Sequence, residues 1–220
     1  MTAELLAQRR VAVSAVFGME RWAIENADLL RPFLEKFNPV SKAELKKISA
    51  LTTPNSVLAI AELPDEPFSP ELLCDNYCFY LDGIQDPGNL GTMLRVANWF
   101  GIPAVFCSPD SADVFSLKAV QASMGAFLRV KIWEMPLEKL LEAAPGLPVM
   151  GAVLEGKNIF QAALPSNGIV VVGSESRGIG PAVEARLTHR LTILRAPGGG
   201  AESLNAAVAA GIIAAVLRNS

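Results

Sequence analysis

Two glycine-rich loops of this sequence carry side chains that could do chemistry. In the loop from Gly173 to Gly180, three glycines within eight residues let the backbone approach a ligand closely, and Glu175 adds a carboxylate. In the loop from Gly198 to Asn205, a glycine run precedes a helix that Ser203 could open, and Asn205 stands where alanine would suit a helix better. These loops therefore predict a ligand site with a carboxylate and an amide beside it.

A third segment, from Asp86 to Arg95, is expected to face these two loops. A Pro-Gly turn leads to Asn89, which can cap a helix that begins at Leu90. On that helix no acidic residue lies one turn from Arg95 to pair with it. Arg95 is therefore either an ordinary surface arginine or a cation available to a substrate.

The spacing of these residues excludes several common sites. The glycines at 173, 178 and 180 do not follow the dinucleotide-binding pattern, and no Gly-Lys-Ser/Thr of a phosphate-binding loop is present. Neither Ser174 nor Ser176 stands in the Gly-x-Ser-x-Gly pattern of a serine hydrolase, and His189 is the only histidine. Glu175 therefore remains either a solvated loop acid or a group directed into a site.

The elements that must position these loops alternate regularly from Tyr77 onward. Nearly continuous apolar strands separated by helices predict a parallel sheet with helices on both faces, in which ligands bind at the carboxyl ends of the strands. The predicted strands are Cys78–Ile84, Ala104–Cys107, Phe127–Trp133, Val149–Leu154, Ile169–Gly173 and Leu191–Leu194. The predicted helices are Leu90–Phe100, Ala112–Met124, Leu137–Ala143, a short one after Pro181 and one after Ser203.

The first part of the chain, residues 1–65, alternates short helical and extended segments. Ser41 and Glu44 form the capping-box pattern of a helix that runs to about Leu51. A proline-rich stretch, Leu63–Pro70, then predicts a linker, which we place at residues 66–76, and residues 77–220 form the second domain.

Composition limits the partners of the chain. A net charge of −3 and a pI near 5.3 are not typical of proteins that bind nucleic acid by bulk electrostatics, so any RNA contact must use local basic patches. The candidate patches are Arg9 with Arg10, Lys42 with Lys46 and Lys47, and Arg95 with Arg177.

No apolar run is long enough for a membrane span, and no signal peptide precedes the first strand, which favours the cytoplasm. Cys74, Cys78 and Cys107 share no metal-ligand spacing with the single histidine, so we expect buried, reduced thiols and no metal.

Taken together, the three loops resemble the SpoU (TrmH-like) branch of the SPOUT RNA methyltransferases. The matching motifs are Asn-x-Gly-x-x-x-Arg at Asn89, Gly91 and Arg95, Gly-x-Glu-x-x-Gly at Gly173, Glu175 and Gly178, and Glu-Ser-Leu-Asn at Glu202 to Asn205. A weaker match covers Lys118 to Ala126. Each motif alone is unspecific, but their order and their places at strand ends are specific to the family.

The resemblance implies a SPOUT fold, which is an α/β domain with a C-terminal trefoil knot, and a homodimer. It implies methyl transfer from S-adenosylmethionine to a ribose 2′-hydroxyl of RNA, with ribosomal RNA favoured and transfer RNA possible. Residues 41–61 resemble the end of the family's L7Ae-like RNA-binding domain, whose front is shortened here.

The resemblance also implies roles for particular residues. The implied catalytic residues are Arg95, Asn89, Glu175, Ser203 and Asn205. The implied cofactor-binding residues are Val153, Leu154, Gly173, Gly178, Leu194, Arg195, Gly199, Ser203 and Leu204.

One position departs from the family's pattern, and other functions stay open. The family usually has Ile-Pro-Met before the third glycine stretch, where this chain has Arg195-Ala-Pro197, so Arg195 could alter the adenine pocket or bind a ligand itself. The alternatives are an RNA-binding protein of this fold that has lost catalysis, a SPOUT enzyme that methylates a base, and a plain nucleotide-binding α/β domain.

Overall fold

The computed structural model describes residues 1–198 and 200–219, and the chain forms two compact units, Met1–Pro67 and Phe68–Ser220. Phe68 belongs to the second unit because its ring packs edge-on against Phe106 and Trp133, with ring centroids 5.5 Å apart in both pairs. The 3-10 helix η2 (Pro70–Leu73) follows and buries Leu73 in the second unit. Much of the predicted linker is therefore packed structure.

The first unit contains a three-stranded sheet in the order β2-β1-β3. Its strands are β1 (Val13–Gly18), β2 (Phe37–Pro39) and β3 (Val57–Ala61), with β2 parallel and β3 antiparallel to β1. Its helices are α1 (Thr2–Gln8), α2 (Glu20–Glu25), α3 (Ala27–Leu30), η1 (Arg31–Lys36) and α4 (Lys42–Ile48). The predicted capping box is confirmed: Ser41 and Glu44 exchange side-chain and backbone hydrogen bonds at the start of α4.

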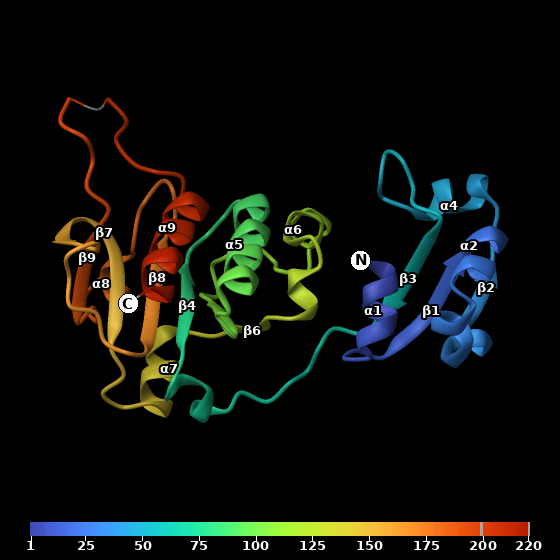
Figure 1. The fold of residues 1–220 in the computed structure, drawn as a ribbon, viewed down its shortest axis with the longest axis horizontal. Coiled ribbons are helices and arrows are strands. Elements are labelled where there is room, and N and C mark those ends of the chain that lie inside the picture. Colours follow the sequence, from blue (N-terminus) through green and yellow to red (C-terminus); the bar gives the residue numbers. More distant parts are fainter. Residues whose placement is uncertain (199, 220) are drawn as a thin grey trace. The chain divides into compact units, whose positions relative to one another are not determined.

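The second unit contains a six-stranded sheet in the order β6-β5-β4-β8-β7-β9, in which every pair is parallel (Figure 1). Its strands are β4 (Tyr77–Asp82), β5 (Ala104–Cys107), β6 (Lys131–Glu134), β7 (Val149–Asn158), β8 (Gly168–Gly173) and β9 (His189–Thr192). Its helices are α5 (Pro87–Phe100), α6 (Leu117–Ser123), η3 (Ala126–Leu128), α7 (Leu137–Ala143), α8 (Pro181–Glu184) and α9 (Ala206–Arg218). The predicted parallel α/β domain is confirmed.

Successive side chains of a strand point to opposite faces of the sheet, so each strand contributes to the cores on both faces. Phe79 and Leu81 of β4 pack in one core with α5 and α9. Cys78 and Tyr80 of the same strand pack in a second core with α7 and α8. Coverage of both faces explains why the strands are apolar along their whole length.

Close helix packing depends on small residues. A Cβ added to Gly91 of α5 would lie 2.3 Å from the carbonyl oxygen of Ala119, so only glycine permits this approach of α6. The alanine-rich helix α9 packs beside α5, where Gly211 comes near Val96 (Figure 1). The segment of small residues at the end of the chain is therefore an interhelical contact surface.

Two predicted helix starts are wrong. Helix α5 begins at Pro87 instead of Leu90, and Asp86 caps it by accepting the backbone N–H of Asn89 at 3.2 Å. Helix α9 begins at Ala206, and its cap is Asn205 instead of Ser203. In both cases the true cap leaves another polar side chain available for the site, as described below.

Several other expectations need correction. The predicted strand Phe127–Trp133 splits into η3 and β6, and the predicted helix Ala112–Met124 shortens to α6 because Ser116 caps it. Among the thiols, Cys78 and Cys107 are buried as expected, and burial raises the pKa of each to about 12, whereas Cys74 is exposed.

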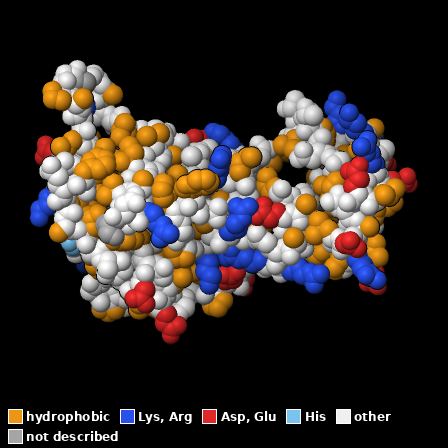
Figure 2. Space-filling view, in the orientation of Figure 1, with side chains coloured by type: hydrophobic (Ala, Val, Ile, Leu, Met, Phe, Trp, Pro, Cys, Tyr) orange, Lys and Arg blue, Asp and Glu red, His pale blue; other side chains and the backbone are white. Residues whose placement is uncertain are grey.

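Hydrophobic side chains gather over α9 and α5 on one face of the second unit (Figure 2). Trp99 of α5 is 82% exposed and Val208 of α9 is 52% exposed. Within the described part of the chain, no helix is long and apolar enough to cross a membrane.

Candidate functional site

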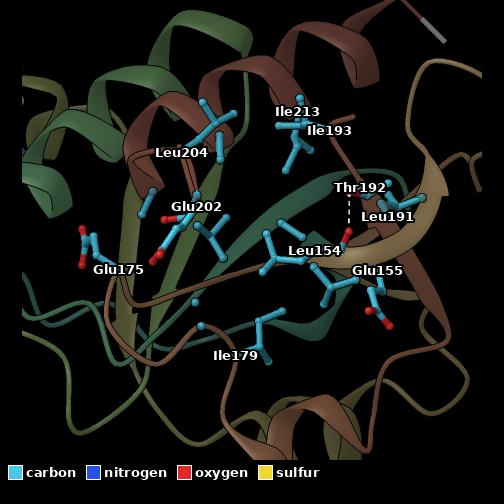
Figure 3. A pocket seen from close by; sticks show the side chains of 18 of the residues that line it. Leu154, Glu155, Glu175, Ile179, Leu191, Thr192, Ile193, Glu202, Leu204 and Ile213 are labelled. Atoms are coloured by element: carbon cyan, nitrogen blue, oxygen red, sulfur yellow. Dashed lines mark hydrogen bonds between the residues drawn. The ribbon is translucent and has the colours of Figure 1, made fainter. Parts of the chain in front are cut away.

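A cavity of about 920 Å³ opens at the carboxyl ends of β7, β8 and β9, beside the start of α9. Figure 3 shows Glu175 and Glu202 at one end of this cavity and Glu155 at the other, with Leu154 between them. The side chain of Thr192 donates a hydrogen bond to the carbonyl oxygen of Leu154 at 3.0 Å, which ties β9 to β7 on the cavity wall. The cavity lies where parallel α/β sheets bind ligands.

Most of the predicted cofactor residues line this cavity. Those that do so are Val153, Leu154, Gly173, Gly178, Leu194, Arg195, Ser203 and Leu204. The predicted residue Gly199 lies outside the described residues. The sequence did not single out the apolar residues of the wall that come from the core, such as Ile159 and Ile213, because their pattern indicates only burial.

The loop after β8 is a tight turn that displays Glu175. Ser174 and Gly178 exchange backbone hydrogen bonds of 3.0 Å and 2.8 Å. A Cβ on Gly173 would lie 2.2 Å from the backbone of Gly178, which itself adopts a φ of +69°. Both glycines are therefore needed for the turn, and Glu175 is exposed at its tip.

Three predicted catalytic residues from three separate segments of the chain are joined by hydrogen bonds. The amide nitrogen of Asn89 donates to a carboxylate oxygen of Glu175. The side-chain oxygen of Asn89 accepts a hydrogen bond of 3.0 Å from the amide nitrogen of Asn205. The side-chain oxygen of Asn205 in turn accepts the backbone N–H groups of Ala207 and Val208 at 3.0 Å and 3.2 Å.

This network fixes the orientation of both amides. Because the oxygen of Asn205 is used by the cap of α9, its nitrogen must face Asn89. Asn89 then presents its oxygen to Asn205 and its nitrogen to Glu175. Since Asp86 caps α5, Asn89 is available for this role.

The other two predicted catalytic residues lie outside the network. Ser203 lines the cavity and is exposed. Arg95 is exposed on α5, is not among the residues that line the cavity, and has no ion-pair partner in the described part of the chain. Within one copy of this chain, the structure therefore does not bring Arg95 to the cavity.

Two acidic residues, at the end of β4 and at the start of α5, hold neighbouring elements in place. Asp82, at the end of β4, accepts the backbone N–H of Gly180 at 2.6 Å, and burial raises the pKa of its carboxyl group. Asp86 pairs with Lys118 of α6, and this pairing lowers the pKa of Asp86. We did not predict these contacts from the sequence, although a carboxylate that ends a buried apolar strand, as Asp82 does, was a usable signal.

Arg195, where the chain departs from the family pattern, lies on the cavity wall and donates a hydrogen bond of 3.0 Å to the carbonyl oxygen of Ala201. It therefore bridges the two ends of the loop before α9. Among the residues that the structure describes, no group of three histidine, cysteine or acidic side chains could hold a metal ion.

Comparisons with known proteins show which proteins this chain resembles in sequence. A sequence model of the SpoU rRNA Methylase family matches residues 76–215. The 23S rRNA (guanosine(2553)-2′-O)-methyltransferase RlmP of Bacillus subtilis is 30% identical over 182 residues, which cover 81% of this chain and 71% of that enzyme. The 23S rRNA (guanosine-2′-O-)-methyltransferase RlmB of Coxiella burnetii is 34% identical over 139 residues, which cover 60% of this chain and 54% of that enzyme.

Solved structures give the same result. A TrmH-family protein from Porphyromonas gingivalis has a TM-score of 0.84 at 38% identity, and the match covers 99% of this chain and 86% of that one. An AdoMet-bound rRNA methyltransferase from Sinorhizobium meliloti also has a TM-score of 0.84, at 23% identity, over 99% of this chain and 84% of that one. The second match shows the fold alone.

Proposed function

This chain belongs to the SpoU rRNA methylase family, and we propose that it transfers a methyl group from S-adenosylmethionine to a ribose 2′-hydroxyl of ribosomal RNA. The observation that carries this proposal is the hydrogen-bonded set Glu175, Asn89 and Asn205, which unites the three family motifs beside one cavity. We favour ribosomal over transfer RNA because the named relatives RlmP and RlmB act on 23S rRNA.

The cavity fits S-adenosylmethionine in size and in chemistry. Its volume of about 920 Å³ lies within the range of small-molecule sites. Leu154, Leu194 and Leu204 provide apolar walls for a planar base, and a ligand can approach the backbone closely at Gly178, beside which there is open space. Polar groups of Ser203 and Arg195 are available to its ribose and amino-acid end. When bound, S-adenosylmethionine supplies an electrophilic methyl group.

The residues of the chain have two tasks, to orient the ribose and to assist loss of its hydroxyl proton. We assign orientation to Asn89 and Asn205, whose amides the network holds in fixed directions, and to Ser203, which lines the cavity. Glu175, exposed at the tip of its turn, then lies close to the target nucleotide.

Arg95 is proposed as the catalytic residue through its charge. An arginine is a poor base because its pKa exceeds about 12. Its exposed guanidinium, which has no ion-pair partner among the residues that the structure describes, can instead bind the phosphate next to the target ribose. It would thereby lower the pKa of the 2′-hydroxyl and let phosphate or water take the proton.

We further propose that the second unit forms a trefoil knot. The chain leaves β9 at the edge of the sheet and returns to pack α9 against α5 (Figure 1). On the way it meets the connection between β7 and β8, since Ile159 of that connection shares a core with Ala206 and Ile213 of α9. Passage of α9 through this connection would account for the shared core.

A homodimer is proposed for two reasons. Trp99 and Val208 expose hydrophobic area on adjacent helices, which a second copy could bury (Figure 2). Arg95 projects from one of those helices, α5, without reaching the cavity of its own chain, so a second copy could bring an arginine to it.

The first unit is proposed to bind RNA as a shortened L7Ae-like domain. Helix α4 buries only Leu45 and exposes Lys42, Lys46 and Lys47. Such a cluster of lysines on one short helix offers phosphate contacts that the acidic chain as a whole does not.

Calorimetry tests the cofactor, and methylation mapping tests the substrate. Titration of S-adenosylmethionine into the protein should show binding, and Gly173→Ala should abolish it because the added Cβ overlaps the backbone of Gly178. Gly146→Ala, at a position with positive φ and open space far from the cavity, controls for the general effect of losing a glycine. Ribosomal RNA from cells that lack the protein should lack one 2′-O-methyl group. A chain that binds RNA but no S-adenosylmethionine would be the inactive alternative.

A further inference from the structure

Arg177 stands two residues after Glu175 and lines the same cavity. Its backbone N–H donates to the hydroxyl oxygen of Ser174 at 3.3 Å, which keeps its backbone in the turn. Its side chain is 65% exposed, and one terminal nitrogen of its guanidinium lies 3.0 Å from a carboxylate oxygen of Asp110. Arg177 therefore lies at the cavity rim in a defined orientation.

Asp110 is itself held by its neighbours. The hydroxyl of Ser108, a buried residue at the end of β5, donates to the other carboxylate oxygen of Asp110 at 2.6 Å. The hydrogen bond from Ser108 and the nearby Arg177 guanidinium lower the pKa of Asp110, so this carboxylate stays ionised. The hydroxyl of Ser108 also accepts the backbone N–H of Gly83 at 2.8 Å.

The side chains of Arg177 and Asp110 pack closely against the backbone of Gly83. A Cβ on Gly83 would lie 2.8 Å from the terminal nitrogen of Arg177 and 3.1 Å from the carboxylate of Asp110. The ends of β4, β5 and β8 thus meet at one point, and the absence of a side chain at Gly83 leaves room for the pair. An exposed ion pair stabilises a fold little. Such a built arrangement therefore suggests a role in orienting the guanidinium.

Asp110 uses only part of the hydrogen-bond donors of the Arg177 guanidinium. A guanidinium carries five N–H groups, and Asp110 is the only side-chain partner of Arg177 within residues 1–198 and 200–219. The remaining N–H groups lie in a fixed plane, and Arg177 follows the exposed Glu175 by two residues on the same turn, where an anionic RNA strand would need a compensating cation. A planar fork of donors suits the two oxygens of a phosphodiester.

We propose that Arg177, oriented by Asp110, binds a backbone phosphate of the RNA beside the nucleotide that enters the cavity. Arg177 is an RNA-binding residue and Asp110 is a positioning residue. This proposal rests on the proposed function, because it takes RNA to be the substrate. It places a cation on the turn that carries Glu175, so that the acidic turn can accept an RNA strand.

The test measures binding of a 23S rRNA transcript, synthesised without modifications, by filter retention at about 0.1 M salt. Arg177→Gln should raise the Kd about tenfold, the usual effect of losing a charged hydrogen-bonded contact. It should also reduce the slope of log Kd against log salt by about 0.7 to 0.9, the contribution of one phosphate. Arg177→Lys should restore part of the affinity, and Arg186→Gln is the matched control, an exposed arginine outside the cavity wall.

The direction in which Asp110→Asn changes the RNA affinity is a second test. If only net charge mattered, loss of this negative charge would tighten RNA binding. If Asp110 positions Arg177, the same change should weaken binding by about threefold, because the guanidinium loses its fixed orientation. Asp75→Asn makes the same charge change at an exposed site without this contact and should not weaken binding. With Arg177→Gln already present, Asp110→Asn should have no further weakening effect.

Three results would overturn the proposal. They are failure of the parent protein to bind the transcript, equal binding by Arg177→Gln and Arg186→Gln, and tighter binding by Asp110→Asn. Affinity for S-adenosylmethionine is measured in parallel. A loss there with unchanged RNA affinity would assign Arg177 to the cofactor instead. A parent protein that binds the transcript through Arg177 but transfers no methyl group would refute the proposed function and leave this inference standing.

Discussion

Asn89→Asp tests the hydrogen-bond network at its centre with almost no change of shape. Asn89 donates to the carboxylate of Glu175 through its nitrogen, and aspartate has no donor at that position. The variant loses a hydrogen bond to a charged group, which contributes about 1.5–3 kcal/mol. It also places two carboxylates in contact, which costs about 1 kcal/mol at an exposed position. A combined loss of about 2.5–4 kcal/mol corresponds to a kcat/KM for methyl transfer that is lower by roughly 70-fold to 900-fold.

Stability should fall as well, because both contacts exist in the folded protein without substrate. Residue 89 lies in the first turn of α5, where a negative charge interacts favourably with the helix dipole by about 0.3–1 kcal/mol and offsets part of the loss. Urea denaturation should therefore show Asn89→Asp to be less stable than the parent by about 1.5–3.5 kcal/mol. A loss of activity measured at a temperature where the variant is fully folded separates a functional role from a structural one.

The assay is the initial rate of tritiated methyl transfer to unmodified ribosomal RNA, with Asn98→Asp as control at a partly exposed position on the same helix. Lowering the pH from about 8 to about 5 should recover part of the activity of Asn89→Asp, because a proton shared between two carboxylates restores a donor. If Asn89→Asp and Asn98→Asp have equal rates at every pH, the network does not contribute to catalysis and our reasoning about it is refuted.

Three further predictions concern stability and assembly. Gly91→Ala should lower the free energy of unfolding by about 1–3 kcal/mol in urea titrations, since its Cβ would press on the carbonyl of Ala119; an unchanged midpoint would contradict the packing described. Burial raises the pKa of Asp82 above its ordinary 3.8. The contribution of Asp82 to the free energy of unfolding therefore falls as the pH rises from 3.8 through the raised pKa. Asp82→Asn should therefore raise the Tm at about pH 7 but not at about pH 3. A larger rise in Tm at about pH 3 than at about pH 7 would contradict a raised pKa for Asp82. Trp99→Glu should shift the sedimentation coefficient from dimer to monomer, and a parent protein that already sediments as a monomer would refute the proposed dimer.

The second domain was largely predictable from its strand patterns. Runs such as Ala104–Cys107 and Leu137–Ala143 have the observed bounds, because continuous apolar residues or a clear helical period leave little choice. The errors include the predicted strand Phe127–Trp133, which begins as the 3-10 helix η3, and two helix starts, where several polar residues compete. Asp86 and Asn89 could both cap α5, and only the structure shows that the aspartate caps while the asparagine contacts Glu175.

The candidate site was predictable in its parts but not in its connections. The motifs identified Asn89, Glu175 and Asn205 separately, and no spacing rule could show that one amide joins the other two residues. The pair Asp110 and Arg177 was harder to predict, since it depends on how the ends of three strands meet in space. Contacts between residues far apart in sequence leave no local pattern to detect.

The central claim is methylation of a ribose, and nucleoside analysis tests it most directly. Ribosomal RNA from cells that lack the protein is incubated with the purified chain and S-adenosylmethionine carrying a labelled methyl group. The RNA is then digested to nucleosides and separated by mass. We predict that the label appears in a single 2′-O-methylnucleoside and disappears with Asn89→Asp. Label on a base, or no label in any nucleoside, would contradict the account.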